Sequence, residues 1–388
     1  MRFREALAQG GFGAIAEFKR RSPSAGDLRP HGDVVAVARA YEAAGASAMS
    51  VLVDERFGGT WDDLRAARAA TSLPLLAKGF FGAEDDLRTA REAGADAVLL
   101  LLRDLDDHVA ASLAATAASL DLDTLVEAHD RSELDRAVAL GAPVIGVNAR
   151  DLATFAVDRA AQLELVAHAP RDRIVVAESG IETRAQAAAA ELAGADAVLV
   201  GSTLMRAREP GEELRRLVRR PLVKVCGLTR PQDVDAAVHA GADLVGFILA
   251  KESPRRAAAL LEAPDTVLRV AVFVGEAEET DADLVQLYGR ENGHRARDAV
   301  LLRRGERVAT VVDLPWGESD ASHLERARAT SGRVMLAGGL GSANVADAIA
   351  AVRPWAVDSA RSTESEPGVK DHDALRRFVE AAHARERV

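Results

Sequence analysis

Six polar residues in the first half of the chain each lie at or near the end of an otherwise apolar segment. They are two lysines, three glutamates and one asparagine: Glu17, Lys19, Lys78, Glu127, Asn148 and Glu178. Taken singly, each could be an exposed surface residue. Gathered in one place, lysines and carboxylates shift one another's pKa, so that a single site supplies both a proton donor and a proton acceptor. The pattern therefore predicts acid–base chemistry, provided that the fold brings these segments together.

The strands and helices that must position these residues repeat at a regular spacing along the chain. Apolar, β-branched runs recur about every 25 residues, each followed by an Ala-rich amphipathic stretch, which is typical of parallel strands joined by helices. Eight such strands would close a (β/α)8 barrel, whose catalytic groups lie at the C-terminal ends of the strands. In the first part we expect strands at 14–19, 48–53, 75–80, 97–102, 124–128, 144–148, 174–178 and 197–201.

A second, shorter barrel is expected after the first. A helix over 211–219 should end at Pro221, and a new strand begins directly afterwards, so we expect domains of residues 1–220 and 221–388. Only residues 276–283 separate the third strand from the fourth, which is too short for a crossover helix. The seven strands expected here are 223–226, 244–249, 268–274, 284–287, 308–313, 334–337 and 356–358.

Small residues end the last strands of both parts. Ser179 and Gly180 follow the seventh strand of the first part, and Gly201 and Ser202 end the eighth. Loops at these two positions, with backbone N–H groups at a helix start, commonly hold phosphate in such barrels. The pair Gly338-Gly339 repeats the arrangement in the second part, so we expect a phosphate site in each.

Composition excludes several other classes of protein. The net charge of −11 across 388 residues, without a basic cluster, argues against nucleic acid. The single cysteine, Cys226, suits a reducing cytoplasm, and neither a signal peptide nor a membrane span is indicated. No His/Asp/Glu cluster has metal-ligand spacing, and His129 and His372 are expected to be solvated. We expect no metal, no cofactor, no membrane partner, anionic sugar-phosphate substrates and, by default, a monomer.

The first part resembles indole-3-glycerol phosphate synthases. The resemblance covers residues 1 to about 220 and rests on the segments AEFKRRSPS (16–24), SVLVDERFGG (50–59), KGF (78–80), VE (126–127), GVNARDL (146–152) and ESGI (178–181). It implies ring closure of 1-(2-carboxyphenylamino)-1-deoxyribulose 5-phosphate with loss of CO2 and water.

The same resemblance implies roles for particular residues. Lys78 would be the general acid, Glu127 the proton-transferring partner and Lys19 the holder of the substrate carboxylate. The reacting carbons would be oriented by Glu17, Asn148, Glu178 and Ser179, and the substrate would be bound by Ser24, Arg150, Gly180, Gly201 and Ser202. Two departures are a short segment before the first strand and Gly79, where the family has an aspartate.

The second part resembles phosphoribosylanthranilate isomerases. The segments KVCGLTR (224–230), SPR (253–255), VQL (285–287), AGGL (337–340) and EPGVKD (366–371) carry this resemblance. It implies an Amadori rearrangement of N-(5-phosphoribosyl)anthranilate, with Cys226 as base, Asp313 as acid and Arg255 on the anthranilate carboxylate. Three features depart from the family: Tyr288 in place of a histidine, and the segments 314–317 and 359–362.

Three interpretations remain open at this point. The chain could be a bifunctional enzyme of tryptophan synthesis, or a synthase whose second barrel is a structural, non-catalytic domain. A third interpretation, another sugar-phosphate isomerase barrel, finds no support in the lysine and glutamate residues of the first part.

Overall fold

The computed structural model describes residues 2–23, 25–150, 156–314 and 320–384. By the contacts between residues, the chain divides into two compact units. One comprises Met1–Glu182 and Ala187–Val218, and the other comprises Thr183–Gln186 and Arg219–Val388. Across the described residues, no helix combines the length and the apolar character that crossing a bilayer requires.

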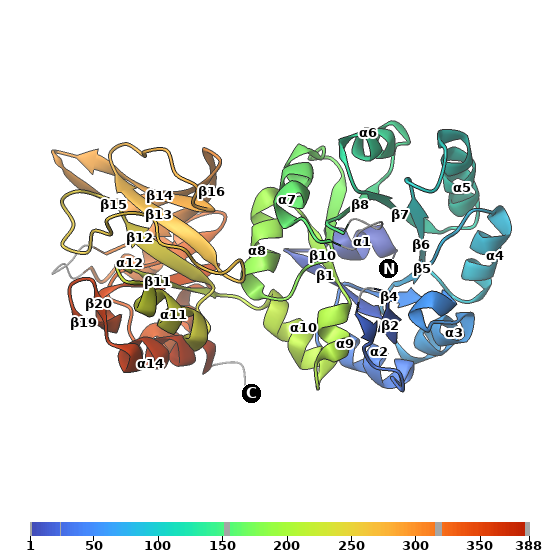
Figure 1. Ribbon diagram of the computed structural model, residues 1–388, viewed down its shortest axis with the longest axis horizontal. Coiled ribbons are helices and arrows are strands. Elements are labelled where there is room, and N and C mark those ends of the chain that lie inside the picture. The colour runs from blue at the N-terminus through green and yellow to red at the C-terminus, as the bar shows by residue number, and fades with distance from the viewer. Residues whose placement is uncertain (1, 24, 151–155, 315–319, 385–388) are drawn as a thin grey trace. The chain divides into compact units, whose positions relative to one another are not determined.

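The first unit is built on a closed barrel of eight parallel strands, which confirms the expected fold (Figure 1). Each strand pairs with its neighbours in chain order, and the first pairs with the last at Gly13–Ala197 to close the ring. All eight expected strands are present, with ends that differ by no more than two residues. The strands are β1 (Gly13–Phe18), β4 (Ala48–Leu52), β5 (Leu75–Lys78), β6 (Ala97–Leu101), β7 (Asp123–Ala128), β8 (Val144–Asn148), β9 (Ile174–Glu178) and β10 (Ala197–Val200).

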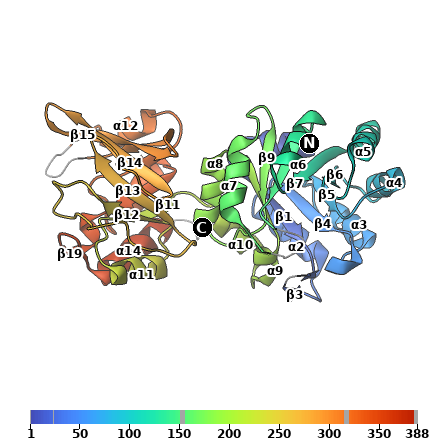
Figure 2. The same ribbon diagram turned by 45° about the horizontal axis from the view of Figure 1, so that its top comes forward.

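Helices surround this barrel on its outer side (Figure 2). Several begin at an aspartate or threonine whose side chain accepts a hydrogen bond from the first helical turn, for example Thr60, Asp106 and Asp130, which fixes where each helix starts. They are α2 (Val34–Ala43), α3 (Trp61–Ala70), α4 (Glu84–Glu92), α5 (Asp107–Ser119), α6 (Arg131–Ala139), α7 (Arg159–His168), α8 (Arg184–Ala193), α9 (Ser202–Arg206) and α10 (Pro210–Val218).

The strands are buried on both faces, which explains their continuous apolar runs. Inside the barrel, residues such as Ile15, Leu76 and Leu125 pack together, and a second layer lies between the strands and the helices. The short helix α1 (Phe3–Ala8) joins the inner cluster through Phe3 and Leu7. Its Arg4 backbone N–H donates to Asp123, the first residue of β7, so α1 covers the end of the barrel opposite the strand C-termini.

The second unit is also a closed eight-stranded barrel, so the expectation of seven strands was wrong by one. Its strands are β11 (Leu222–Cys226), β12 (Leu244–Ile248), β13 (Leu268–Val274), β14 (Leu284–Glu291), β15 (His294–Arg303), β16 (Glu306–Val312), β17 (Val334–Leu336) and β18 (Ala356–Ser359). The additional strand, β15, runs antiparallel to both β14 and β16, whereas the other neighbouring pairs are parallel.

This barrel is shortened in its helices. Residues 249–305 are all described and contain none, so β14, β15 and β16 follow one another by tight turns. The helices present are α11 (Pro231–Ala240), α12 (His323–Ala329), α13 (Val345–Val352) and α14 (His372–His383). Four successive strand connections, from β12 to β16, thus lack a helix, and the hairpin strand β15 completes the ring.

Candidate active sites

The first site lies where the strands of the first barrel end. A cavity of about 460 Å³ opens there, lined by Glu17, Lys19, Lys78, Glu127 and Asn148 among others. Glu178 ends β9 and is 1% exposed; it contacts Lys78, which lines the cavity, at 2.6 Å. The six residues that the sequence singled out therefore converge from five different strands.

Lys78 is the centre of this cluster. Its Nζ lies 2.6 Å from Glu178 Oε2, 3.6 Å from Glu127 Oε2 and 3.7 Å from Glu17 Oε2. Burial alone would lower the pKa of this amine, but the three carboxylates outweigh burial and raise it. Lys78 is therefore held as an ammonium group.

The two carboxylates nearest Lys78 differ in proton affinity. Burial raises the pKa of Glu127, but the Lys78 charge, His129 and Asn148 lower it to about 2. For Glu178, burial and the negative charge of Glu127 prevail over Lys78 and raise the pKa to about 8. Pairs of titratable groups with diverging pKa values are characteristic of acid–base sites.

Each oxygen of Glu127 has a different environment. Oε1 accepts a hydrogen bond of 2.8 Å from Asn148 Nδ2 and lies 3.2 Å from His129 Nε2. Oε2 is buried and has no hydrogen-bond partner. His129, expected to be solvated, has a side chain only 14% exposed and contacts two carboxylates, so that expectation was wrong. His372 is half exposed but lies 2.9 Å from Asp233.

Lys19 and Glu17 form a pair at the other side of the cavity, with Nζ and Oε1 2.7 Å apart. The net effect on Glu17 is a lowered pKa, because Lys19 and Lys78 together outweigh burial. Gly201 packs directly against this pair, since a Cβ at its position would lie 2.2 Å from Glu17 Oε1. The absence of a side chain there is what gives Glu17 its position.

The expected phosphate end also lines the cavity. Ser179 (φ 68°) and Gly180 (φ 71°) both adopt the left-handed conformation, and they lie with Gly201 and Ser202 around one end. Arg150 lines the same cavity, and burial lowers its pKa. Ser24 lies outside the described residues. Arg159 and Arg206, two further cations of the lining, were not predicted from the sequence.

At Gly79, where an aspartate was expected from the family, the neighbouring side chains leave little room for a larger residue. A Cβ at this position would lie 2.9 Å from the Phe81 ring and 3.2 Å from a Val53 methyl group. A larger side chain would require Phe81 to move. This chain therefore combines Gly79 with a ring packed over it.

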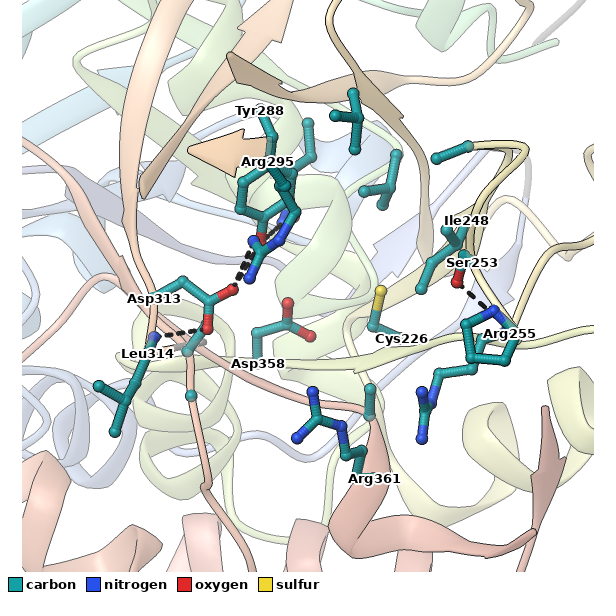
Figure 3. Close-up of a pocket in the computed structure, with 18 of the residues that line it drawn as sticks. Cys226, Ile248, Ser253, Arg255, Tyr288, Arg295, Asp313, Leu314, Asp358 and Arg361 are labelled. Carbon is teal, nitrogen blue, oxygen red and sulfur yellow. Dashed lines mark hydrogen bonds and ion pairs between the residues drawn. The ribbon is translucent and has the colours of Figure 1, made fainter. Parts of the chain in front are cut away.

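The second site is a cavity of about 510 Å³ at the corresponding end of the second barrel. It is lined by all five residues predicted there: Cys226, Arg255, Asp313, Gly338 and Gly339. In Figure 3, Asp358 lies between Asp313 and Cys226, with Arg255 and Arg361 on one side and Tyr288 and Arg295 on the other.

Cys226 ends β11 above a buried polar network. The network centres on Lys224, whose Nζ donates to Gln286 Oε1 at 2.7 Å and to Asp358 Oδ2 at 2.9 Å. Burial raises the pKa of the Cys226 thiol more than the neighbouring Lys224 lowers it. Asp358 Oδ1 is buried without a hydrogen-bond partner, and burial raises the pKa of this carboxyl. Lys224, Gln286 and Asp358 were not among the site residues predicted from the sequence.

Asp313 is held by groups from two strands. Tyr288 OH donates to Asp313 Oδ2 at 2.9 Å, and Arg295 Nη1 donates to the same oxygen at 3.0 Å. The Arg295 guanidinium also lies over the Tyr288 ring, 4.1 Å from its centroid. Tyr288 is the residue expected from the sequence to replace a histidine, and Arg295 comes from the reversed strand β15.

The two arginines on the opposite side differ in their surroundings. Arg255 Nε contacts both oxygens of Glu364, at 2.8 and 3.1 Å. Arg361 lies in the turn η2 (Arg361–Thr363) where the family has a small loop, and burial and Arg255 lower its pKa. In the part of the chain that the structure describes, no group of three His, Cys, Asp or Glu side chains could hold a metal ion.

Comparison with known proteins shows the family of the first barrel. Residues 1–217 match the family model of indole-3-glycerol phosphate synthase. The chain belongs to the indole-3-glycerol phosphate synthase family. The synthase of Acidithiobacillus ferrooxidans is 46% identical over 215 residues, which span 55% of this chain and 82% of that protein. The Mycobacterium ulcerans synthase is 46% identical over 214 residues, covering 55% and 79%.

The second barrel has its own relatives. Residues 316–381 match the family model of N-(5'-phosphoribosyl)anthranilate isomerase, so a synthase domain and an isomerase domain share one chain. Among solved structures, TrpF from Jonesia denitrificans is 28% identical, with a TM-score of 0.35, covering 42% of this chain and 97% of that one. Phosphoribosylanthranilate isomerase from Thermotoga maritima is 29% identical, with a TM-score of 0.35, covering 42% and 99%.

Proposed function

We propose that the first barrel converts 1-(2-carboxyphenylamino)-1-deoxyribulose 5-phosphate into indole-3-glycerol phosphate, with release of CO2 and water. The observation that carries this proposal is the Lys78 ammonium within 3.7 Å of three glutamate side chains at a single cavity. Ring closure requires a proton donor to the substrate ketone and a proton acceptor nearby, and this cluster contains both.

The substrate has two anionic ends and one carbonyl group, and each has a candidate partner. Lys78 would protonate the ketone oxygen as the aromatic carbon attacks, and loss of CO2 would restore the aromatic ring. Glu127, through its unbonded Oε2, would take a proton in the dehydration step. Lys19 would hold the carboxylate, and Gly180, Gly201 and Ser202, with Arg150, would bind the phosphate end; Glu17, Asn148, Glu178 and Ser179 would orient the reacting carbons.

For the second barrel we propose isomerisation of N-(5-phosphoribosyl)anthranilate, with the two domains spanning residues 1–220 and 221–388. Asp313 would protonate the ring oxygen as the C1–O bond opens, and Cys226 would remove the C2 proton. Support comes from the shared cavity that both residues line together with Arg255, Gly338 and Gly339.

A specific observation keeps the non-catalytic alternative for the second barrel. Two of its candidate residues are engaged within the protein, Asp313 by Arg295 and Arg255 by Glu364. A structural domain would retain such pairs, whereas an enzyme must exchange at least one of them for substrate.

The synthase proposal is tested with the full chain and the carboxyphenylamino substrate. We expect indole absorbance and fluorescence to appear with the wild type, and the rate to fall at least about 1,000-fold for Lys78→Met, which removes the proton donor. A wild-type rate at background, or a Lys78→Met variant with near-normal activity, would contradict the proposal.

The isomerase proposal is tested in a bacterial strain that lacks only this isomerase. Rescue of growth without tryptophan would require a functional second site, and Cys226→Ala should abolish rescue while leaving indole formation unchanged. If the wild-type chain fails to rescue, the second barrel is the structural domain of the alternative.

A further inference from the structure

His129 lies between the candidate proton-transfer residue and a helix. It follows β7 directly, and α6 begins two residues later with Asp130 as its N-cap. Its Nδ1 lies 3.0 Å from Glu133 Oε2, and its Nε2 lies 3.2 Å from Glu127 Oε1. The backbone N–H of His129 also donates to Glu133 Oε2, at 2.8 Å, which fixes the glutamate against the turn.

The chemistry of the ring determines its charge. A neutral imidazole has one N–H donor and one acceptor nitrogen, whereas an ionised carboxylate only accepts. Because a carboxylate oxygen faces each nitrogen of the His129 ring, both contacts are favourable only when each nitrogen carries a proton. Although burial lowers the pKa of His129, Glu127 and Glu133 together raise it to about 9.

The positive charge of His129 lies next to one oxygen of Glu127, Oε1. Asn148 donates a hydrogen bond to Oε1, and His129 Nε2 lies 3.2 Å from the same oxygen as an ion-pair contact without hydrogen-bond geometry. Oε2 is left buried, without a hydrogen bond, 3.6 Å from Lys78 Nζ. We propose that His129 is a positioning residue: as an imidazolium it fixes Glu127 Oε1, so that Oε2 alone exchanges protons at the cavity. This inference rests on the proposed synthase activity of the first barrel.

The groups around His129 set the expected pH dependence. Glu127 faces it from β7 and Glu133 from α6, with Arg136 of α6 acting on Glu133. Lys78 on β5 acts on Glu127, and Asn148 on β8 is uncharged. As the pH rises, Glu178, with a pKa of about 8, loses its proton before His129, whose pKa is about 9, and Lys78, whose pKa is raised above its usual value, loses its proton after both.

The principal experiment replaces His129 by glutamine, which retains an amide donor but no charge. We expect His129→Gln to lower kcat of the synthase about 10- to 100-fold with KM within about twofold, because a misplaced catalytic group costs rate more than affinity. The fall of wild-type activity near pH 9 should disappear in this variant. His108→Gln, an exposed histidine of α5, is the matched control and should behave as the wild type.

A second variant keeps the histidine and alters only its partner. Glu133→Gln removes one carboxylate from the ring, so the alkaline fall in activity should begin about one pH unit lower or more. If His129→Gln fails to fold, this shift still tests the proposal. An unchanged alkaline limb in Glu133→Gln, or a kcat of His129→Gln within about twofold of the wild type, would overturn it.

A measurement independent of turnover separates this inference from the proposed function. Nitrogen-15 spectra of the histidine rings of the full chain should show His129 doubly protonated at pH 7, with a midpoint near 9 that Glu133→Gln lowers. A neutral His129 at pH 7 would overturn the inference even in an active enzyme. An inactive wild type with a charged His129 would instead refute the proposed synthase reaction.

Discussion

Gly201 directly follows the last strand of the first barrel, and there is no room for a side chain at its position. A Cβ there would lie 2.2 Å from Glu17 Oε1 and 3.0 Å from Lys19 Nζ. We expect Gly201→Ala to displace this pair and lower synthase kcat/KM about 10- to 100-fold, since a shift of about 1 Å in an active site has effects of this size. Gly82→Ala is the control, because its Cβ would meet open space. Equal activity of the two variants, measured by indole fluorescence, would refute this account of Gly201.

The raised pKa of His129 also has a consequence for stability. A histidine whose pKa rises from 6.5 to about 9 on folding contributes stability that is fully present below pH 6.5 and is lost as the pH rises through 9. We therefore expect the free energy of unfolding of the wild type to fall more steeply between pH 7 and 9.5 than that of His129→Gln. Urea unfolding at a series of pH values measures this, and parallel curves would contradict it.

The regular elements were largely predictable because their burial leaves a simple pattern. Parallel strands such as β6 (Ala97–Leu101) are buried on both faces, so they appear as continuous apolar runs between Ala-rich helices. β15 (His294–Arg303) escaped prediction because its first half carries charged residues and few buried ones, and because it pairs antiparallel with both neighbours. A pattern of strands that alternate with helices does not indicate a strand that is joined to its neighbours by tight turns.

The candidate sites were predictable to the same extent and for a related reason. Residues at strand ends, such as Lys78 and Glu127, could be named because parallel strands point their C-termini to one face. His129 lies one residue beyond β7, as Lys19 does beyond β1, but its partner Glu133 lies on the next helix, so the strand pattern does not indicate that these two side chains meet. Buried groups such as Lys224 look like ordinary strand residues until the barrel closes around them.

The reversed direction of β15 carries a prediction of its own. Its first residues lie at the face where the parallel strands end, which brings Arg295 to Asp313. If the second barrel is an isomerase, Arg295→Gln should lower isomerase kcat/KM about 10-fold or more by releasing Asp313, while synthase activity in the same chain stays unchanged. Arg303→Gln, at the other end of β15, is the control. Matching losses in both variants would show that β15 contributes only to folding.

In the part of the chain that the structure describes, each barrel has core clusters of its own. The clusters of the first barrel draw on residues from Phe3 to Leu217, and the cluster of the second draws on residues from Val223 to Ala382. No described member of either set belongs to the other unit. Since a closed barrel buries its apolar faces within itself, each unit has the means to fold around its own core.

This separation predicts that damage to one core stays local. Leu76 is fully buried inside the first barrel and Phe378 is fully buried on α14 of the second. Truncating Leu76 to alanine should lower the stability of its barrel by about 2–5 kcal/mol, and Phe378→Ala should do so by about 3–5 kcal/mol. Hydrogen exchange read by mass spectrometry assigns protection to peptides of each barrel. We expect Leu76→Ala to speed exchange only before residue 219 and Phe378→Ala only after it. Faster exchange in both barrels from either variant would mean that the two barrels unfold as one cooperative unit.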